Sequence, residues 1–221
     1  MRVLITYNNE ANPGLKSGWG FSCLIEKMEK SILFDTGCSG PDLVYNMKQL
    51  NFSPKDVDIL FLSHQHWDHI GGLFEVLELN KKIEVFVLKS FSKNLKDEIS
   101  KRAILKEIER EQEIIKDIYT TGLIRNNPDE QSLILKTIKG IIVITGCSHP
   151  GVDKILDIAR KHGEIYAIIG GFHEFSEFEL LKGIEVIGAC HCTKYKEKIK
   201  ENFSKQFKEI KAGDIIEIRD V

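Results

Sequence analysis

Four residues that can bind a metal lie within one short stretch of this chain. They belong to the segment Ser63-His64-Gln65-His66-Trp67-Asp68-His69. An apolar run at 58–62 precedes them and predicts a buried strand that ends just before His64. Because alternate residues of an extended segment face the same way, His64 and His66 can bind one ion. Asp68 and His69 follow a bend, so they can reach a second ion nearby.

This combination of side chains indicates a catalytic rather than a structural metal site. Imidazole and carboxylate ligands suit zinc, iron or manganese, and the stretch holds no cysteine, which argues against a closed structural zinc site. The alternative is a solvated polar loop whose histidines have no role. The strand pattern before the stretch and the helical pattern after it favour the metal site, since a motif of this kind depends on that context.

Three further histidines each follow an apolar run and small residues at an expected strand end. They are His149 after 141–148, His173 after 168–172 and His191 after 184–190. Taken alone, each is typical of a core or surface residue whose ring is hydrogen-bonded locally. Three in series after a metal-binding stretch instead predict that strand ends deliver more ligands to the site. His162 is interpreted as a residue at the negative end of a helix dipole.

The stretch His64-Gln65-His66-Trp67-Asp68-His69 resembles the HxHxDH signature of the metallo-β-lactamase superfamily. Asp35, in Phe34-Asp35-Thr36-Gly37, resembles the early aspartate of that superfamily. More narrowly, the chain resembles a prokaryotic branch of metal-dependent hydrolases, which includes archaeal enzymes assigned to the dihydropterin-ribofuranosylaminobenzene-phosphate synthase step of methanopterin biosynthesis. The segments that carry this likeness are Trp19-Gly20-Phe21-Ser22, Leu33-Phe34-Asp35-Thr36-Gly37, Asn46-Met47-Lys48, His66-Trp67-Asp68-His69-Ile70-Gly71-Gly72-Leu73, Gly146-Cys147-Ser148-His149-Pro150-Gly151, Gly170-Gly171-Phe172-His173 and His191-Cys192-Thr193.

The resemblance implies that the chain binds one or two divalent metal ions, with zinc as the expected metal and manganese or iron as alternatives. The six implied ligands are His64, His66 and His149 for the first ion and Asp68, His69 and His191 for the second.

One departure from the superfamily pattern concerns the residue that bridges the two metals. Most members carry an aspartate in a Gly-Asp pair at a strand end, and here that place holds Gly170-Gly171. Without this carboxylate, negative charge is missing between two cations, which predicts weaker binding of one ion. His173, two residues further on, is left with three alternatives: a metal ligand, a polar group over the metals, or a contact to substrate.

The implied activity is metal-dependent hydrolysis of an ester, a lactone or a phosphoester by a metal-activated water. A divalent ion lowers the pKa of bound water from about 15.7 toward 7 and can polarise a carbonyl or phosphoryl oxygen. Asp68 is the expected catalytic residue, which orients that water and accepts a proton. Asp35 is interpreted either as the partner that holds a ligand histidine in the right tautomer or as a turn residue before Thr36-Gly37.

The sequence leaves two alternative functions open. The branch resemblance favours a transferase that condenses a dihydropterin diphosphate with an aminobenzene ribofuranosyl phosphate. The missing bridge instead favours a non-catalytic or oxygen-handling metal protein.

Trp19 and Trp67 have two interpretations. They could stack on a flat substrate ring such as a pterin, or they could pack in the core, which is the more common fate of tryptophan. Cys147 and Cys190 lie close to implied ligand histidines, which suggests a metal-binding or redox role. The favoured interpretation is that they are small buried side chains packed under the site.

Composition limits the partners that the chain is expected to have. With 42% hydrophobic residues it can bury a substantial core, and we expect one domain over 1–221. Lys and Arg number 31 against 33 Asp and Glu, so no global charge favours nucleic acid, and a small-molecule substrate is expected. We expect no membrane partner and no signal peptide, and five cysteines then fit a reduced cytoplasmic compartment. A homo-oligomer stays open.

The sequence pattern predicts both β-strands and α-helices in each half of the chain. Segment 90–116 is charged and favours helix, so it is interpreted as an amphipathic surface helix, with a lid or a dimer contact as alternatives. The resemblance implies an α/β (α+β) fold, a four-layer αββα sandwich in which two mixed β-sheets pack face to face with helices outside. Strands are expected near 2–7, 20–26, 31–35, 58–63, 84–88, 132–137, 140–146, 164–169, 184–188 and 214–218, and helices near 41–50, 73–79, 151–162 and 194–204.

Overall fold

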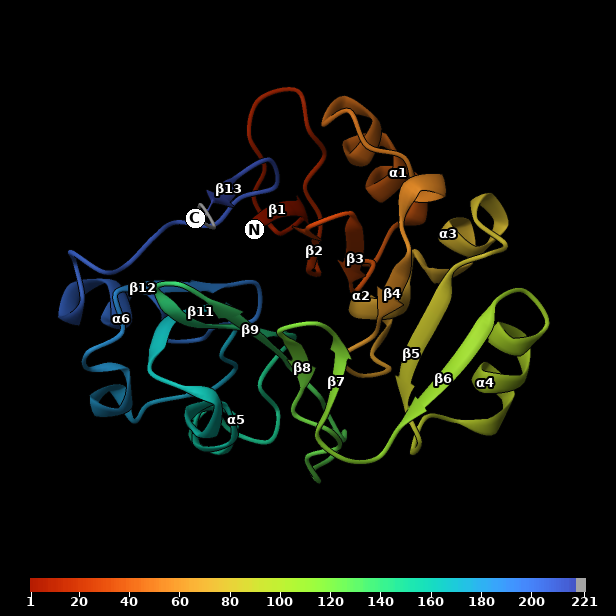
Figure 1. The fold of residues 1–221 in the computed structure, drawn as a ribbon. Coiled ribbons are helices and arrows are strands. Elements are labelled where there is room, and N and C mark those ends of the chain that lie inside the picture. Colours follow the sequence, from red (N-terminus) through yellow and green to blue (C-terminus); the bar gives the residue numbers. More distant parts are fainter. Residues whose placement is uncertain (218–221) are drawn as a thin grey trace. The chain divides into compact units, whose positions relative to one another are not determined.

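The computed structural model describes residues 1–217 and divides the chain into two compact units. The first unit comprises Met1–Glu109 together with the segment that starts at Lys211, and the second comprises Arg110–Ile210. Each unit builds one mixed β-sheet and has helices of its own (Figure 1). The expectation of a single domain over the whole chain stays a prediction.

The described part of the first unit forms a seven-stranded sheet in the order β13-β1-β2-β3-β4-β5-β6. Neighbours from β13 to β3 are antiparallel, and neighbours from β3 to β6 are parallel. The apolar run 59–62 is wholly buried, as parallel strands at the centre of a sheet require. The strands are β1 (Arg2–Tyr7), β2 (Ser22–Lys27), β3 (Lys30–Phe34), β4 (Ile59–Phe61), β5 (Glu84–Leu88), β6 (Ile104–Ile108) and β13 (Ile215–Glu217).

Local signals explain where the helices of this unit begin. At the start of α1 the Ser39 hydroxyl accepts a hydrogen bond from the Asp42 N–H at 3.4 Å, and Pro41 lies in the first turn. In α3 the buried residues are Leu73, Val76 and Leu77, a spacing that places them on one helix face. The helices are α1 (Gly40–Gln49), α2 (Trp67–Ile70), α3 (Leu73–Leu79) and α4 (Lys93–Ser100), with a 3-10 turn at Pro54–Asp56.

The second unit forms a six-stranded sheet in the order β12-β11-β10-β9-β8-β7. Neighbours from β7 to β10 are antiparallel, and β10, β11 and β12 run parallel. Its strands are β7 (Gln112–Ile115), β8 (Ile118–Thr120), β9 (Leu133–Thr137), β10 (Gly140–Thr145), β11 (Ile165–Gly171) and β12 (Val186–Cys190).

The helices of the second unit cover an apolar core. In α5 (Val152–Ala159) the buried residues are Val152, Ile155, Leu156 and Ala159, which form one stripe along the helix. These side chains belong to the same buried cluster as Val143 of β10, Ile168 of β11 and Ile187 of β12. α6 (Lys196–Asn202) adds Ile199 to the cluster, and 3-10 turns lie at Arg160–His162 and Phe178–Leu181.

Parallel pairing places the carboxyl ends of neighbouring strands at one edge of each sheet. In the first unit β3 and β4 are parallel, so Asp35 and the segment 62–66 leave the sheet at the same edge. In the second unit the segments 146–149, 172–173 and 191–193 follow the three parallel strands β10, β11 and β12. Carboxyl ends of parallel strands are where open sheets commonly bind ligands.

The expectation of one long helix over 90–116 is wrong. α4 covers only Lys93–Ser100, and the rest of the segment holds β6 and β7. Each of these is the edge strand of its sheet. Exposed edge strands carry charged residues, here Lys106 and Glu107, which discourage pairing with other chains and obscure the alternating apolar pattern of a strand. The short strand β8 was not expected either, and position 218 of the expected strand 214–218 lies outside the described residues.

Candidate metal centre

The four donors of the first unit lie together after β4. His66 has extended backbone (φ −73°, ψ 146°) and directly precedes α2, whose first turn contains Asp68 and His69. The ring centroid of His64 lies 4.8 Å from that of His66 and 4.2 Å from that of His69. Ligand atoms of His64 and His66 are within 4.8 Å of each other, and so are those of Asp68 and His69. The short stretch therefore presents two adjacent pairs of metal-binding atoms.

Asp35 is a buried carboxylate that organises this stretch. It follows β3 with left-handed backbone (φ 54°), and its side chain is fully buried. The Ser63 N–H donates to its Oδ1 and the Ser63 hydroxyl to its Oδ2, each at 2.7 Å. The Nδ1 of His69 lies 2.7 Å from the same Oδ2. This is the contact expected of a residue that orients a metal-binding imidazole.

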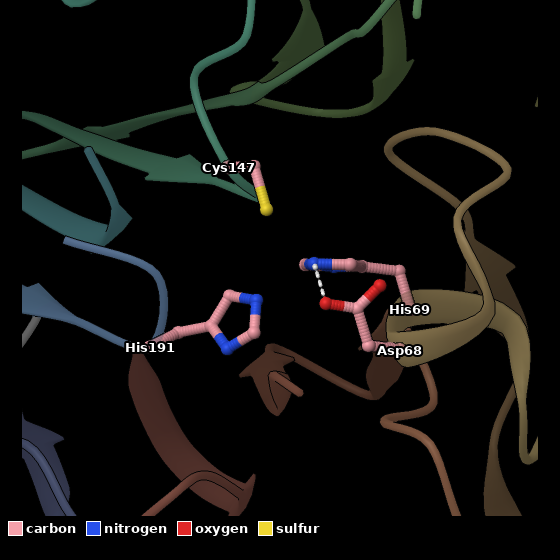
Figure 2. Close-up of side chains that lie close together, drawn as sticks. All are labelled: Asp68, His69, Cys147 and His191. Carbon is pink, nitrogen blue, oxygen red and sulfur yellow. Dashed lines mark ion pairs between the residues drawn. The ribbon is translucent and has the colours of Figure 1, made fainter. Parts of the chain in front are cut away.

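The hydrogen bonds around Asp35 also decide which nitrogen of each imidazole carries the proton. A carboxylate only accepts, so His69 donates through Nδ1–H and keeps its lone pair on Nε2. The Ser63 hydroxyl already donates a hydrogen bond to Asp35, so its oxygen accepts one from the Nδ1–H of His64 at 2.9 Å. Both rings are held in the tautomer whose Nε2 can bind a metal. The Nε2 of His69 lies 3.8 Å from Oδ2 of Asp68 (Figure 2).

Close backbone packing holds α2 against the loop after β3. The carbonyl of His69 accepts from the Thr36 N–H at 2.7 Å and from the Thr36 hydroxyl at 2.9 Å. Gly20 has φ 140°, and a Cβ there would lie 2.4 Å from the backbone oxygen of Asp68. Only glycine fits so close to this turn, which explains why a glycine follows Trp19 in the sequence.

The second unit places its donors at the ends of parallel strands. Cys147 follows β10 and His191 follows β12 (Figure 2). The Sγ of Cys147 and a ring nitrogen of His191 lie within 4.8 Å of each other. The ring centroid of His149 lies 4.8 Å from that of His173. His173 and His191 have left-handed backbone (φ 43° and 49°), a conformation of order 1–3 kcal/mol above the usual one that gathers at functional sites.

Glu130 is a functional candidate that the sequence reasoning missed. Its buried carboxylate accepts hydrogen bonds from four consecutive backbone N–H groups of the loop after β10. Oε1 accepts from Gly146 at 3.1 Å, from Cys147 at 2.9 Å and from Ser148 at 3.0 Å, and Oε2 accepts from His149 at 2.8 Å. Glu130 therefore shapes the loop that carries two donors. A single glutamate between two strands carries no motif, so the sequence offered no signal for it.

A cavity of about 290 Å³ opens beside His149 and His173 in the second unit. Phe172 and Phe175 give it apolar walls, and Glu174 lies at its border. The Lys194 ammonium, 2.7 Å from Oε1 of Glu174, donates a hydrogen bond that lowers the pKa of this carboxyl. The other lining residues are Ser148, Gly151, Val152, Asp153, Ser176 and Glu177.

Both tryptophans are exposed, so the expectation that they pack in the core is wrong. Trp19 is 49% exposed and Trp67 is 63% exposed. Trp19 lies between Gly18 and Gly20, and Trp67 directly follows His66. Trp67 begins α2 between the donors His66 and Asp68, and a contact to substrate is the interpretation that remains.

Within residues 1–217, no helix combines the length and the apolar character that crossing a bilayer needs.

The model of the metallo-β-lactamase superfamily matches residues 20–153. This segment contains the whole donor stretch of the first unit and also Glu130, Cys147 and His149.

Two proteins of Methanocaldococcus jannaschii are similar over most of their length. The 7,8-dihydropterin-6-methyl-4-(β-D-ribofuranosyl)-aminobenzene-5′-phosphate synthase is 33% identical, over 89% of this chain and 89% of that protein. An uncharacterised protein is 31% identical, over 77% of this chain and 78% of its own length.

A solved structure, described as a metal-dependent hydrolase of the β-lactamase superfamily, matches with a TM-score of 0.79. It is 29% identical, and the match covers 100% of both chains. The expected fold class is thereby confirmed: two mixed sheets with helices, as in metallo-β-lactamase folds.

Proposed function

Because this chain belongs to the metallo-β-lactamase superfamily, we propose that it is a metal-dependent hydrolase that acts on an ester, a lactone or a phosphoester. The observation that carries the proposal is the donor stretch of the first unit, in which a buried aspartate fixes the tautomers of two histidines. A structural or solvated loop has no need of that arrangement, whereas metal-binding imidazoles commonly donate their second N–H to such a partner.

The proposed ligand set is the one that the family pattern implies. This pattern assigns His64, His66 and His149 to the first ion, and Asp68, His69 and His191 to the second. The donor chemistry fits a divalent metal, since neutral imidazole nitrogens and a carboxylate are ligands of zinc, iron and manganese. Zinc is the proposed metal.

The residues have separate tasks in the proposed reaction. A bound divalent ion would supply an activated water and polarise the oxygen under attack. Asp68, only 7% exposed, orients that water and accepts its proton through the carboxylate. Asp35 keeps the His69 ring in the metal-binding tautomer, and the Ser63 hydroxyl does the same for His64.

We propose a small-molecule substrate in a cytoplasmic setting. The cavity beside His149 and His173 is close to the size range of small-ligand pockets, about 300–1,000 Å³. Trp67 adds an exposed aromatic face next to the donors, which suits a flat ring. None of the five cysteines, all within residues 1–217, forms a disulfide, which fits a reducing compartment.

The test is turnover of model substrates by metal-loaded protein. Purified chain would be freed of metal, reloaded with zinc, manganese or iron(II), and assayed against aryl esters, lactones and phosphoesters. We expect turnover of at least one class that disappears when the metal is removed and returns when it is restored. Protein that binds metal yet leaves the whole panel unchanged would contradict the hydrolase proposal.

Two histidine variants make a matched control for this assay. His66→Ala removes a proposed ligand. His162→Ala removes a histidine whose Nε2 lies 2.8 Å from Glu111 and which belongs to no proposed ligand set. Loss of turnover in the first variant and its retention in the second would tie the activity to the metal ligands.

A second candidate is the transferase reaction, which the 33% identity to the pterin synthase favours. In this reaction a dihydropterin diphosphate condenses with an aminobenzene ribofuranosyl phosphate, and diphosphate leaves. A direct assay with both substrates, read by product formation and diphosphate release, separates the two candidates. Product without hydrolysis of the model panel would support the transferase, and the absence of product would remove it.

A further inference from the structure

We propose that Cys147 is a metal ligand, whose thiolate binds the same ion as His191 and supplies the negative charge that an aspartate brings in most of the superfamily. This inference rests on the proposed metal enzyme and concerns residues of the second unit. It names a ligand that the family pattern leaves out, and it carries a separate prediction about which metal the second site prefers.

The first step is that the structure leaves no room for an aspartate at the usual place. A Cβ at Gly171 would lie 2.6 Å from the Sγ of Cys192, 2.7 Å from the backbone oxygen of Gly146 and 3.2 Å from the Cα of Cys147. Contacts this short with backbone atoms require the chain to move. The preceding Gly170 has φ 132°, a conformation that L side chains rarely adopt. The missing carboxylate therefore follows from tight packing of β11 against the loop after β10.

The second step is that Cys147 lies where this packing occurs. Its backbone fills the space beside Gly171, and the residue is buried, with only 2% of its surface exposed. Its Sγ lies within 4.8 Å of a ring nitrogen of His191, the proposed ligand of the second ion. Two ligand atoms on one tetrahedral zinc lie about 3.5 Å apart, so a small side-chain movement lets both bind one ion.

The third step is that the backbone of Cys147 is fixed. Its N–H donates to Oε1 of Glu130 at 2.9 Å, and its carbonyl lies 3.8 Å from the Sγ of Cys192. The next residue, Ser148, has left-handed backbone (φ 58°), and its hydroxyl donates to the Gly171 carbonyl at 2.7 Å. The loop that carries Cys147 is therefore held from both sides.

The chemistry of sulfur gives the proposal its consequence. On binding, the thiol proton leaves to solvent and a metal–sulfur bond forms, so one negative charge returns to the site that lacks the carboxylate. Thiolate is a soft ligand that selects zinc over manganese, whereas carboxylate suits manganese. We therefore expect the second site to prefer zinc.

The experiment reads the bond directly, without an activity assay. Metal-free chain is titrated with cobalt(II), which takes zinc sites and shows a sulfur-to-cobalt charge-transfer band in the near ultraviolet when a thiolate binds it. We expect this band in the unaltered chain, its loss in Cys147→Ser and its retention in the matched control Cys192→Ser. Cys147→Asp should still bind the second ion but show no band, and Cys147→Ser should bind that ion more weakly than the unaltered chain.

The outcomes separate this inference from the proposed function. A chain that binds two cobalt ions without the band, or that keeps the band in Cys147→Ser, would overturn the thiolate ligand and leave the metal enzyme standing. Loss of the band in Cys192→Ser alone would also overturn it. A chain that binds no metal would overturn the proposed function and this inference with it. Circular dichroism of each variant shows whether it folds, and Cys147→Asp supplies the test if Cys147→Ser does not.

Discussion

The two units of this chain each support their donors with one buried carboxylate, but the two carboxylates act on different groups. Asp35 of the first unit accepts hydrogen bonds from the Ser63 side chain and from the His69 ring. Glu130 of the second unit accepts hydrogen bonds from the four backbone N–H groups of the loop 146–149. The first carboxylate fixes where protons lie on ligand imidazoles, and the second fixes the path of the chain.

This difference follows from how the donors are distributed along the sequence. The first unit carries its four donors within one strand end and one helical turn, so their backbone positions are set locally and the rings need orientation. The second unit gathers its donors from separate strand ends, so its loops need a scaffold. We therefore expect changes in the first unit to act on chemistry and changes in the second to act on stability as well.

Replacing a donor of the first unit should have the largest effect. His66→Ala should abolish activity and leave the fold intact, because His66 is exposed and its loss opens no cavity in the core. Turnover and circular dichroism measure the two parts of this expectation, with His162→Ala as the control. Unchanged turnover in His66→Ala would contradict the assignment of the first metal.

Replacing Asp35 should have the next largest effect on activity. In Asp35→Asn an amide group can face the Nδ1–H of His69, so the ring loses its acceptor and the metal-binding tautomer is no longer favoured. We expect metal affinity or activity to fall by about 10–100-fold. Asp56→Asn, at an exposed position in the same unit, is the control. If Asp35→Asn binds metal as tightly as the unaltered chain, the interpretation of Asp35 as a turn residue is the one that remains.

Replacing Glu130 should lower the free energy of unfolding and the metal affinity together, unlike a change at Asp35. Glu130→Gln leaves one oxygen for four N–H groups, and a buried donor without an acceptor costs about 1–3 kcal/mol. Urea unfolding should show this loss, and metal affinity should fall in parallel because the loop carries His149. Glu185→Gln, at an exposed position of the second unit, should change neither. A Glu130→Gln variant of unaltered stability would refute the scaffold role.

Replacing Trp67 should have the smallest effect. Its ring is 63% exposed, so Trp67→Ala should change the free energy of unfolding by no more than about 0.5 kcal/mol. A contact to substrate predicts a higher KM with little change in kcat. Equal values of KM in the variant and the unaltered chain would remove Trp67 from the substrate site.

The sequence predicted those parts of the molecule that depend on local patterns. The donor stretch 64–69 is contiguous and follows a buried strand, which the apolar run before it predicted. The helical turn α2 begins at Trp67, whereas the sequence pattern placed the start of a helix only after His69. The buried apolar runs of β4 and β10 were likewise visible. Glu130 was missed because its role depends on a loop that is distant in the sequence, and β6 was missed because an edge strand carries charges that resemble an amphipathic helix. The exposure of Trp19 and Trp67 depends on tertiary structure that no local pattern reveals.

The most direct test of the account is the metal content of the chain purified without added metal, measured by mass spectrometry together with protein concentration. The account predicts one or two divalent ions per chain, with zinc as the main metal, and fewer ions in His66→Ala. Unaltered protein that retains no divalent ion, and that binds none when zinc is supplied, would contradict it.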